Sequence, residues 1–172
     1  MHQRYRSNTC AARAVLSSAL GILCGLMLAA PVLASLSFHR AAAIIYFCFA
    51  PICHQIPERS FALFGAPLAV CHRCAGIYLG MLLGSFINNR AMHRSAKTRR
   101  FWVLSGIVPL LLDVIAPVAG LWSGTGCTRF STGLLFGIVI SSLLVRGVEE
   151  FVQESPWRRL APRTSQLKGG LS

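Results

Sequence analysis

The sequence contains few charged residues, and acidic residues are especially scarce. Of its 172 residues, 13% are charged and only 5 are Asp or Glu, whereas a soluble domain carries about a quarter charged residues. Hydrophobic residues make up 54% of the chain. This composition excludes an ordinary water-soluble globule and indicates one membrane domain, built as a helix bundle in lipid.

The chain nevertheless carries a formal net charge of +12, which raises nucleic acid as a partner. The basic residues, however, lie between and beyond the apolar runs, where cationic loops orient membrane proteins. We therefore expect no nucleic-acid partner. The expected partners are the lipid bilayer and anionic headgroups at its cytoplasmic face.

Four apolar runs are long enough, or nearly so, to cross ~30 Å of hydrocarbon as helices. They cover residues 14–36, 67–88, 101–122 and 131–148. A weaker run from Ala41 to Ile52 is too short to span and predicts an interfacial or re-entrant helix. The expected fold is therefore all-α, with four transmembrane helices and a short interfacial helix in one domain of residues 1–152. Its outer motif loop covers residues 37–66, and residues 153–172 form a polar, basic, disordered cytoplasmic tail.

Lysine and arginine residues are concentrated on one side of this expected bundle. The N-terminal segment, the loop after the second run and the C-terminal region together hold 13, whereas the opposite side holds 4. This bias places both termini in the cytoplasm of a multi-pass protein of the cell inner (plasma) membrane, with the Cys/His segment outside. The first run also resembles a cleavable secretory signal ending at Val32-Leu33-Ala34, in which case three spans would remain.

Glycines recur at four-residue spacing in three of the runs. Small residues at this spacing let helix backbones approach closely in lipid. We expect a packing seam within the bundle, with oligomerisation through these stripes as the alternative. The stripes are Gly21 and Gly25, then Gly76, Gly80 and Gly84, then Gly133 and Gly137.

Five of the seven cysteines are expected at or near the outer surface. Two of them, Cys71 and Cys74, form a Cys-x-x-Cys pair near the start of the second run, where Pro67 suits the first turn of a helix. A helix N-terminus and the neighbouring Arg73 both favour the thiolate that metal binding and redox chemistry require. Cys24, inside the first run, is expected to be a small buried hydrophobe. The five outer cysteines are Cys48, Cys53, Cys71, Cys74 and Cys127.

Three interpretations of this cluster compete. The first is a metal site formed by Cys53, His54, Cys71 and Cys74, a thiolate and imidazole set that suits zinc. The second is a thiol–disulfide oxidoreductase, with Cys71, Cys74 and Cys53 as the redox candidates and a quinone as the electron acceptor. The third is a structural disulfide that pins the outer loop to the second helix. We favour the metal site, and expect Gln55, Glu58 and the outer arginines to surround it with polar groups; His39, His72 and His93 are weaker ligand candidates.

Asp113 stands near the middle of the third run, between Pro109 and Pro117. An ionisable group at that depth is costly and is usually functional or paired. One hypothesis gives Asp113 a proton-coupling role. The other makes it a buried, neutral group or the partner of an arginine, for which Arg73 and Arg129 are the candidates.

The start of the fourth run is a candidate anion site. Ser131 or Thr132 is expected to cap that helix, and a helix N-terminus attracts anions. With Arg59, Arg73 and Arg129 on the same side, a phosphate or lipid headgroup is a candidate ligand. Transport or binding of an anionic lipid headgroup is thus a further alternative function.

Two segments carry a family resemblance. Residues 49–61, FAPICHQIPERSF, resemble the Cys-His-Gln motif of a small prokaryotic membrane-protein family of unknown function. Residues 70–80, VCHRCAGIYLG, resemble its second motif, Cys-x-Arg-Cys-x-Gly-Ile-Tyr. Arg129 with Thr132-Gly133 is similar to a looser third motif.

The resemblance runs from about Tyr46 to Gly137 and implies a polytopic inner-membrane protein, without an established activity. Asp113 falls where the family carries Asp-Gly, and Val114 departs from that pattern. Quinone-linked, disulfide-generating membrane enzymes are similar in topology only, since they share four helices and an outer Cys-x-x-Cys.

Overall fold

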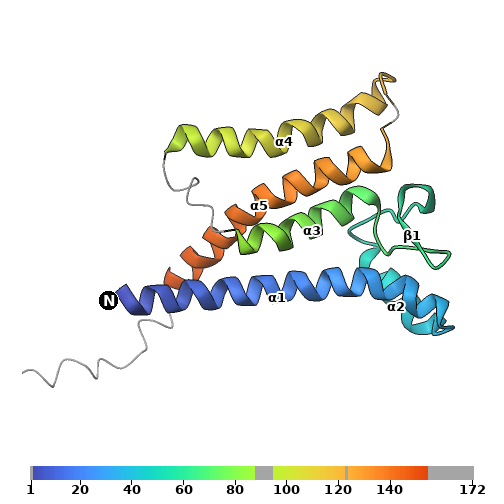
Figure 1. Ribbon diagram of the computed structural model, residues 1–172, viewed down its shortest axis with the longest axis horizontal. Helices are drawn as coiled ribbons and strands as arrows, with labels where there is room; N and C mark the ends of the chain where they lie inside the picture. Colours follow the sequence, from blue (N-terminus) through green and yellow to red (C-terminus); the bar gives the residue numbers. More distant parts are fainter. Residues whose placement is uncertain (1, 88–94, 123, 155–172) are drawn as a thin grey trace, which may run out of the picture.

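The computed structural model describes residues 2–87, 95–122 and 124–154, and it is helical apart from one small hairpin (Figure 1). Pro57–Arg59 form a single 3₁₀ turn, η1. The hairpin pairs β1 (Ala62–Leu63) with β2 (Ala66–Pro67). The five α-helices of the described residues are α1 (His2–Ser35), α2 (His39–Phe49), α3 (His72–Phe86), α4 (Ala96–Val118) and α5 (Gly126–Glu154).

Three segments of the described residues are long and apolar enough to cross a membrane. They are Arg13–Ser35 of α1, all of α4, and Gly126–Val148 of α5. The predicted all-helical membrane fold is confirmed to that extent, and α2 occupies the position of the predicted short helix. The fourth span stays a prediction, because α3 has only 15 residues and is therefore about 22 Å long.

The start of α3 differs from the sequence prediction. The helix begins at His72, and Pro67 lies instead in β2, opposite Ala62 of β1. Phe64 and Gly65 form the turn between the strands, with φ values of 54° and 80°. A two-residue hairpin turn of this kind needs positive φ at both central positions, which a glycine at the second position favours. The hairpin thus includes Pro67, the first residue of the run that hydropathy assigned to the helix.

The helices α3 and α5 pack through their glycines. An added Cβ at Gly84 would lie 2.8 Å from the carbonyl oxygen of Ile138 in α5, and one at Gly80 would meet the Leu134 backbone. Gly133 and Gly137 of α5 face the backbone of α3 in the same way. These two stripes therefore form the predicted seam. The third stripe does not, because an added Cβ at Gly21 or Gly25 meets no atom within 4 Å.

We predict that Gly80→Ala destabilises the protein by about 1–3 kcal/mol, because the new methyl group has to push α5 away. Gly21→Ala is the matched control, since it adds the same methyl group to an open face of α1. Unfolding of both variants by sodium dodecyl sulfate in mixed micelles, followed by circular dichroism, measures the difference. Equal stability of the two variants would contradict the close α3–α5 contact.

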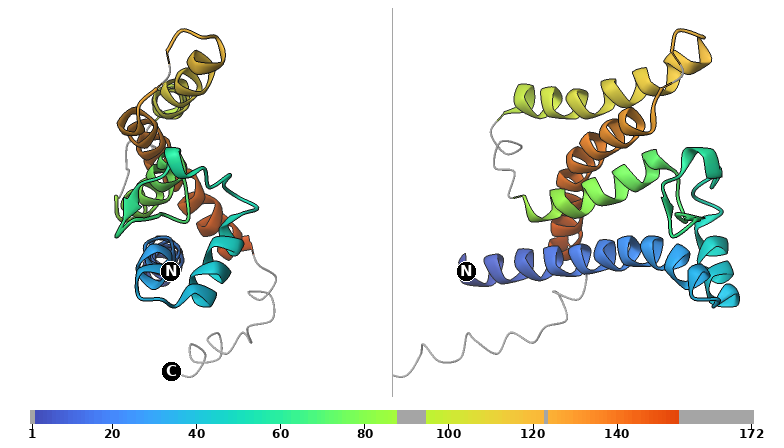
Figure 2. Two further views of the ribbon diagram at one scale, coloured as in Figure 1. Left: turned by 90° about the vertical axis from the view of Figure 1, so that its right-hand side faces the viewer. Right: turned by 45° about the vertical axis from the view of Figure 1, so that its right-hand side comes forward.

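One end of the bundle carries the cysteine motifs, and we call it the thiol end. The segment between α1 and α3 and the turn between α4 and α5 both lie there, whereas α1 begins and α5 finishes at the opposite end (Figures 1 and 2). Helix α3 lies between α1 and α5, and α4 packs on α5 (Figure 1).

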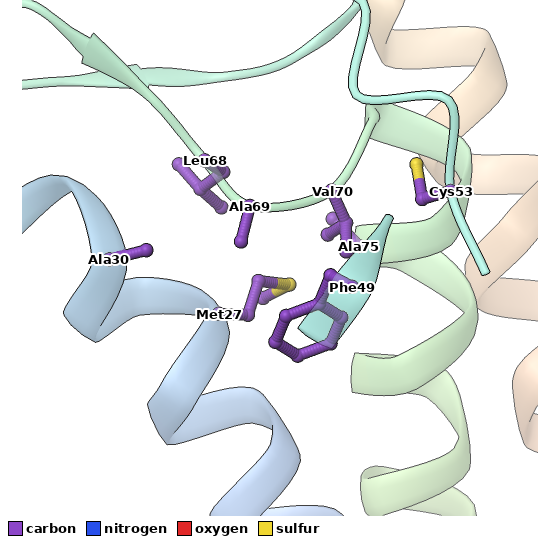
Figure 3. Close-up of a cluster of buried hydrophobic side chains, with 8 residues drawn as sticks. All are labelled: Met27, Ala30, Phe49, Cys53, Leu68, Ala69, Val70 and Ala75. Atoms are coloured by element: carbon purple, nitrogen blue, oxygen red, sulfur yellow. The ribbon is translucent and has the colours of Figure 1, made fainter. Parts of the chain in front are cut away.

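A cluster of buried side chains lies at the thiol end and includes Cys53 (Figure 3). It joins Met27 and Ala30 of α1 to Phe49 of α2 and to the extended segment 68–70. Ala69 and Val70 have no exposed surface. The cluster therefore holds the chain firmly just before Cys71.

Candidate metal centre

Three cysteine sulfurs meet at the thiol end. The Sγ atoms of Cys53, Cys71 and Cys74 all lie within 4.8 Å of one another. The backbone N–H of Cys71 also donates to Sγ of Cys53, at 3.2 Å. Cys53 of the Cys-His-Gln motif and Cys71 of the second motif are 18 residues apart in the chain. They are nevertheless in direct contact in the structure.

Local backbone structure turns Cys53 inward. The N–H groups of Ile52 and Cys53 both donate to the carbonyl of Phe49 at 3.0 Å, which closes the chain into a tight turn after α2. Gln55 continues the turn with a φ of 49°. Cys53 is consequently buried, although it lies outside any helix or strand.

The Gln55 side chain fixes the two motifs relative to each other. Its Nε2 donates to the carbonyl oxygen of Tyr46 at 2.7 Å and to that of Ala69 at 2.9 Å. The Tyr46 hydroxyl donates to the carbonyl oxygen of Pro67. These bonds satisfy backbone carbonyls that the surrounding apolar groups shield from water. The sequence predicted Gln55 among the polar groups around the site but not this bridging role, which its position directly after Cys-His signals only weakly.

Cys71 and Cys74 lie one turn apart at the start of α3, as predicted. Cys71 is the N-cap residue, and its carbonyl accepts the N–H of Ala75 at 2.9 Å. The pKa of the Cys71 thiol is lowered from 9.0, chiefly because the Cys74 thiol donates a hydrogen bond to it, and burial opposes this shift. The pKa of Cys74 is raised, first by that same hydrogen bond and then by burial. One thiolate is thus favoured before any ligand binds.

The sulfurs line a cavity of about 560 Å³. His54 lines it too, but this side chain is exposed and contributes no atom to the close group of ligand atoms. The four proposed metal ligands, the three outer arginines and Asp113 therefore all line one cavity. Among the proposed ligands, the three sulfurs lie close together, whereas the His54 side chain does not reach them. The polar and charged lining residues are Cys53, His54, Arg59, Cys71, Arg73, Cys74, Asp113 and Arg129.

An ion pair between α3 and α4 forms part of the cavity wall. Asp113 is 4% exposed, and its Oδ2 accepts a hydrogen bond from Nη2 of Arg73. The same Nη2 donates to the Asp113 carbonyl oxygen at 3.2 Å. That carbonyl is available because Pro117, four residues later, has no N–H to donate to it. The structure thus pairs Asp113 with one of the two arginines proposed as its partner.

Arg129 approaches the same carboxylate from α5. An added Cβ at Gly124, where φ is 61°, would lie 3.5 Å from both Nε of Arg129 and Oδ1 of Asp113. The α4–α5 turn therefore closes over these two side chains with a glycine in the left-handed region. Neither this glycine nor its role was recognised in the sequence.

The start of α5 also corrects a prediction. The helix begins at Gly126, five residues before Ser131. Thr125 precedes it, and its carbonyl accepts the N–H of Arg129 at 3.1 Å. Oγ1 of Thr125 accepts from the Thr128 N–H at 3.3 Å, while Oγ1 of Thr128 accepts from the Thr125 N–H at 3.0 Å. This reciprocal pair resembles a capping box. The Thr132 hydroxyl instead donates back to the Thr128 carbonyl, at 2.9 Å.

Comparison with known proteins identifies the family. Residues 53–143 match the model of a family described as predicted membrane protein DUF2085. The chain belongs to this family. The matched segment begins at Cys53 and includes Cys71, Cys74, Asp113 and Arg129.

Two archaeal relatives are similar over the same part of the chain. An uncharacterized protein of Methanocaldococcus jannaschii, MJ1492, is 33% identical over 98 residues, which are 56% of this chain and 63% of that protein. An uncharacterized protein of Methanothermobacter thermautotrophicus is 33% identical over 95 residues, which are 55% of this chain and 86% of that protein. The chain thus matches less than two thirds of the first relative. No solved structure matches.

The remaining candidates lie away from the thiols. Cys24 is buried in α1, as predicted, while Cys48 and Cys127 are exposed. The His72 ring packs edge-on against Phe61, with ring centroids 4.3 Å apart, and does not line the cavity. His39 is exposed at the start of α2. His93 and the tail from residue 155 lie outside the described residues.

Proposed function

We propose that this protein is a metal-binding integral membrane protein in which Cys53, Cys71 and Cys74 hold zinc. The observation that carries the proposal is the meeting of three sulfurs, from two separate motifs, within 4.8 Å. Zinc–sulfur bonds of about 2.3 Å in a tetrahedron place sulfurs roughly 3.8 Å apart. The three sulfur atoms would therefore need to move only slightly closer together to bind zinc in that geometry.

We propose His54 as the fourth ligand. It follows Cys53 directly, lines the same cavity and is exposed, so its imidazole has room to turn toward the sulfurs. The tight turn through Gln55 supports this arrangement. A full shell of three thiolates and one imidazole would give the site a structural or sensing role, whereas water in the fourth position would leave it open for hydrolytic chemistry.

Cobalt titration tests the site directly. We expect Co²⁺ added to the metal-free protein in mild detergent to give an intense thiolate-to-cobalt charge-transfer band and tetrahedral d–d bands. His54→Ala should keep the charge-transfer band but bind cobalt roughly tenfold or more weakly, because even loss of a ligand's supporting group costs about 10–100-fold. Absence of a charge-transfer band in the unaltered protein would contradict the proposal.

Thiol–disulfide chemistry is the second candidate, and the lowered pKa of Cys71 favours it, since a thiolate is the attacking species. In this function Cys71 and Cys74 would be oxidised to a disulfide. Two electrons and two protons would pass to a quinone, which becomes the quinol. Quinone reduction by the metal-free, reduced protein would support this candidate, and its absence would remove it.

We also propose that the protein is a multi-pass protein of the inner (plasma) membrane, with the thiol end outside. Basic residues of the described helices support this orientation. Helices α1 and α4 both begin at the end opposite the thiols (Figure 1). Arg13 lies in the first half of α1, and Lys97, Arg99 and Arg100 lie in the first turns of α4. Cys127 is exposed at the thiol end. It should therefore react with a membrane-impermeant maleimide in intact cells, and reaction only after lysis would reverse the orientation.

A further inference from the structure

Three arginines line the cavity beside the thiols. Arg59, Arg73 and Arg129 all line it, against the single carboxylate of Asp113. Arg73 is paired with that carboxylate, and Arg129 lies beside it. Arg59, in η1, is exposed, and Arg129 lies in the first turn of α5, whose N-terminus adds a partial positive charge. The cavity is therefore suited to an anionic group, because guanidinium groups match phosphate oxygens in geometry as well as in charge.

The same cavity has an apolar wall that a small anion would not need. Val114, Pro117 and Val118 supply it from the end of α4, and Ile52 and Ile56 supply it from the segment after α2. Val118 is 86% exposed, and Val114 is also exposed. Helix α4 is a candidate span with most of its surface uncovered. The wall of the cavity is thus continuous with a surface that faces hydrocarbon in a membrane.

From this combination we infer that the cavity binds an anionic phospholipid. Its phosphate lies between Arg59 and Arg129, and an acyl chain follows Val114 and Val118 along α4. The lipid enters sideways from the leaflet at the thiol end. The proposed lipid contacts use none of the three thiols, although the thiols line the same cavity.

Lipid titration of the delipidated protein in neutral detergent tests this site, with native mass spectrometry as the readout. The probes are phosphatidylglycerol, phosphatidylcholine with the same acyl chains, and inorganic phosphate. We expect tighter binding of phosphatidylglycerol than of phosphatidylcholine. Arg59→Gln and Arg129→Gln should each weaken phosphatidylglycerol binding about fivefold, the effect of one arginine near an anionic headgroup. They should weaken phosphatidylcholine binding less, because its choline cation offsets the phosphate charge.

Arg40→Gln is the matched control, because Arg40 is an exposed arginine in the first turn of α2 that does not line the cavity. Arg129→Lys should restore part of the binding if charge is what matters. Should Arg129→Gln fail to fold, Arg59→Gln in an exposed turn still provides the test. Repeating the titration after chelation separates this site from the metal centre, since lipid discrimination should persist without metal.

Three results would overturn the inference. Equal affinity for the two lipids would show that the arginines do not select charge. An equal loss in Arg40→Gln would show that binding reflects general surface charge. Inorganic phosphate binding as tightly as phosphatidylglycerol would show a site for a free anion rather than for a lipid.

Discussion

Replacing Cys53 with serine is expected to reduce bound zinc from about one ion per chain to a small fraction of that value. Cys53 supplies one of the three sulfurs and also accepts the backbone N–H of Cys71, so the change removes a ligand and loosens its neighbour. Structural zinc sites gain about 10–16 kcal/mol from four ligands, or about 3 kcal/mol each, which corresponds to roughly a hundredfold in affinity per ligand. Cys71→Ser and Cys74→Ser should have the same effect.

Cys48→Ser is the control for this experiment. Cys48 is an exposed cysteine of α2, five residues before Cys53 and outside the cluster. Elemental analysis of the purified proteins should find the same zinc content in Cys48→Ser as in the unaltered chain. Retention of zinc in Cys53→Ser, or its loss in Cys48→Ser, would place the metal elsewhere.

Removal of the Asp113 carboxylate is expected to destabilise the protein by about 3 kcal/mol. Asp113→Ala leaves the Arg73 guanidinium without its charged partner in a largely apolar setting, and breaking a buried pair costs about 3–5 kcal/mol. We expect the lower end of that range because Arg73 is still 27% exposed. Unfolding in mixed micelles by sodium dodecyl sulfate measures the loss.

A double variant distinguishes the stability lost with the Arg73–Asp113 ion pair from the stability lost with either side chain alone. Asp113→Leu combined with Arg73→Met replaces both charges by apolar groups, and it should recover much of the stability lost in Asp113→Leu alone. Arg59→Met is the control, since this exposed arginine lines the same cavity. Additive losses in the double variant would mean that the ion pair contributes nothing to stability.

The sequence was sufficient to predict the membrane setting and the thiol cluster, because both follow from composition or from the spacing of residue types. For Asp113 it left a proton-coupling role and an arginine partner open as alternatives. The positions of helix starts were harder. Hydropathy assigned residues 67–71 to a helix, yet Phe64-Gly65 forms a hairpin turn whose second strand contains Pro67. Burial makes such a strand as apolar as a helix, so hydropathy does not distinguish them.

The sequence did not predict that the thiols, the three arginines and Asp113 line one cavity. Positive-inside counting placed Arg59, Arg73 and Arg129 on one side of a membrane but gave no distances between them. Their convergence depends on the close α3–α5 seam and on the turn at Gly124. Pro117 and its missing N–H are visible in the sequence. The sequence does not show that Arg73 of α3 reaches the Asp113 carbonyl oxygen of α4 that this leaves available.

The most direct test of the metal centre is to measure zinc content and reactive thiols on one sample, purified in mild detergent without added reductant. We predict about one zinc per chain. Cys48 and Cys127 should react with a thiol reagent at once, whereas Cys53, Cys71 and Cys74 should react only after a chelator is added. A sample without metal, in which Cys71 and Cys74 form a reducible disulfide, would contradict the metal centre.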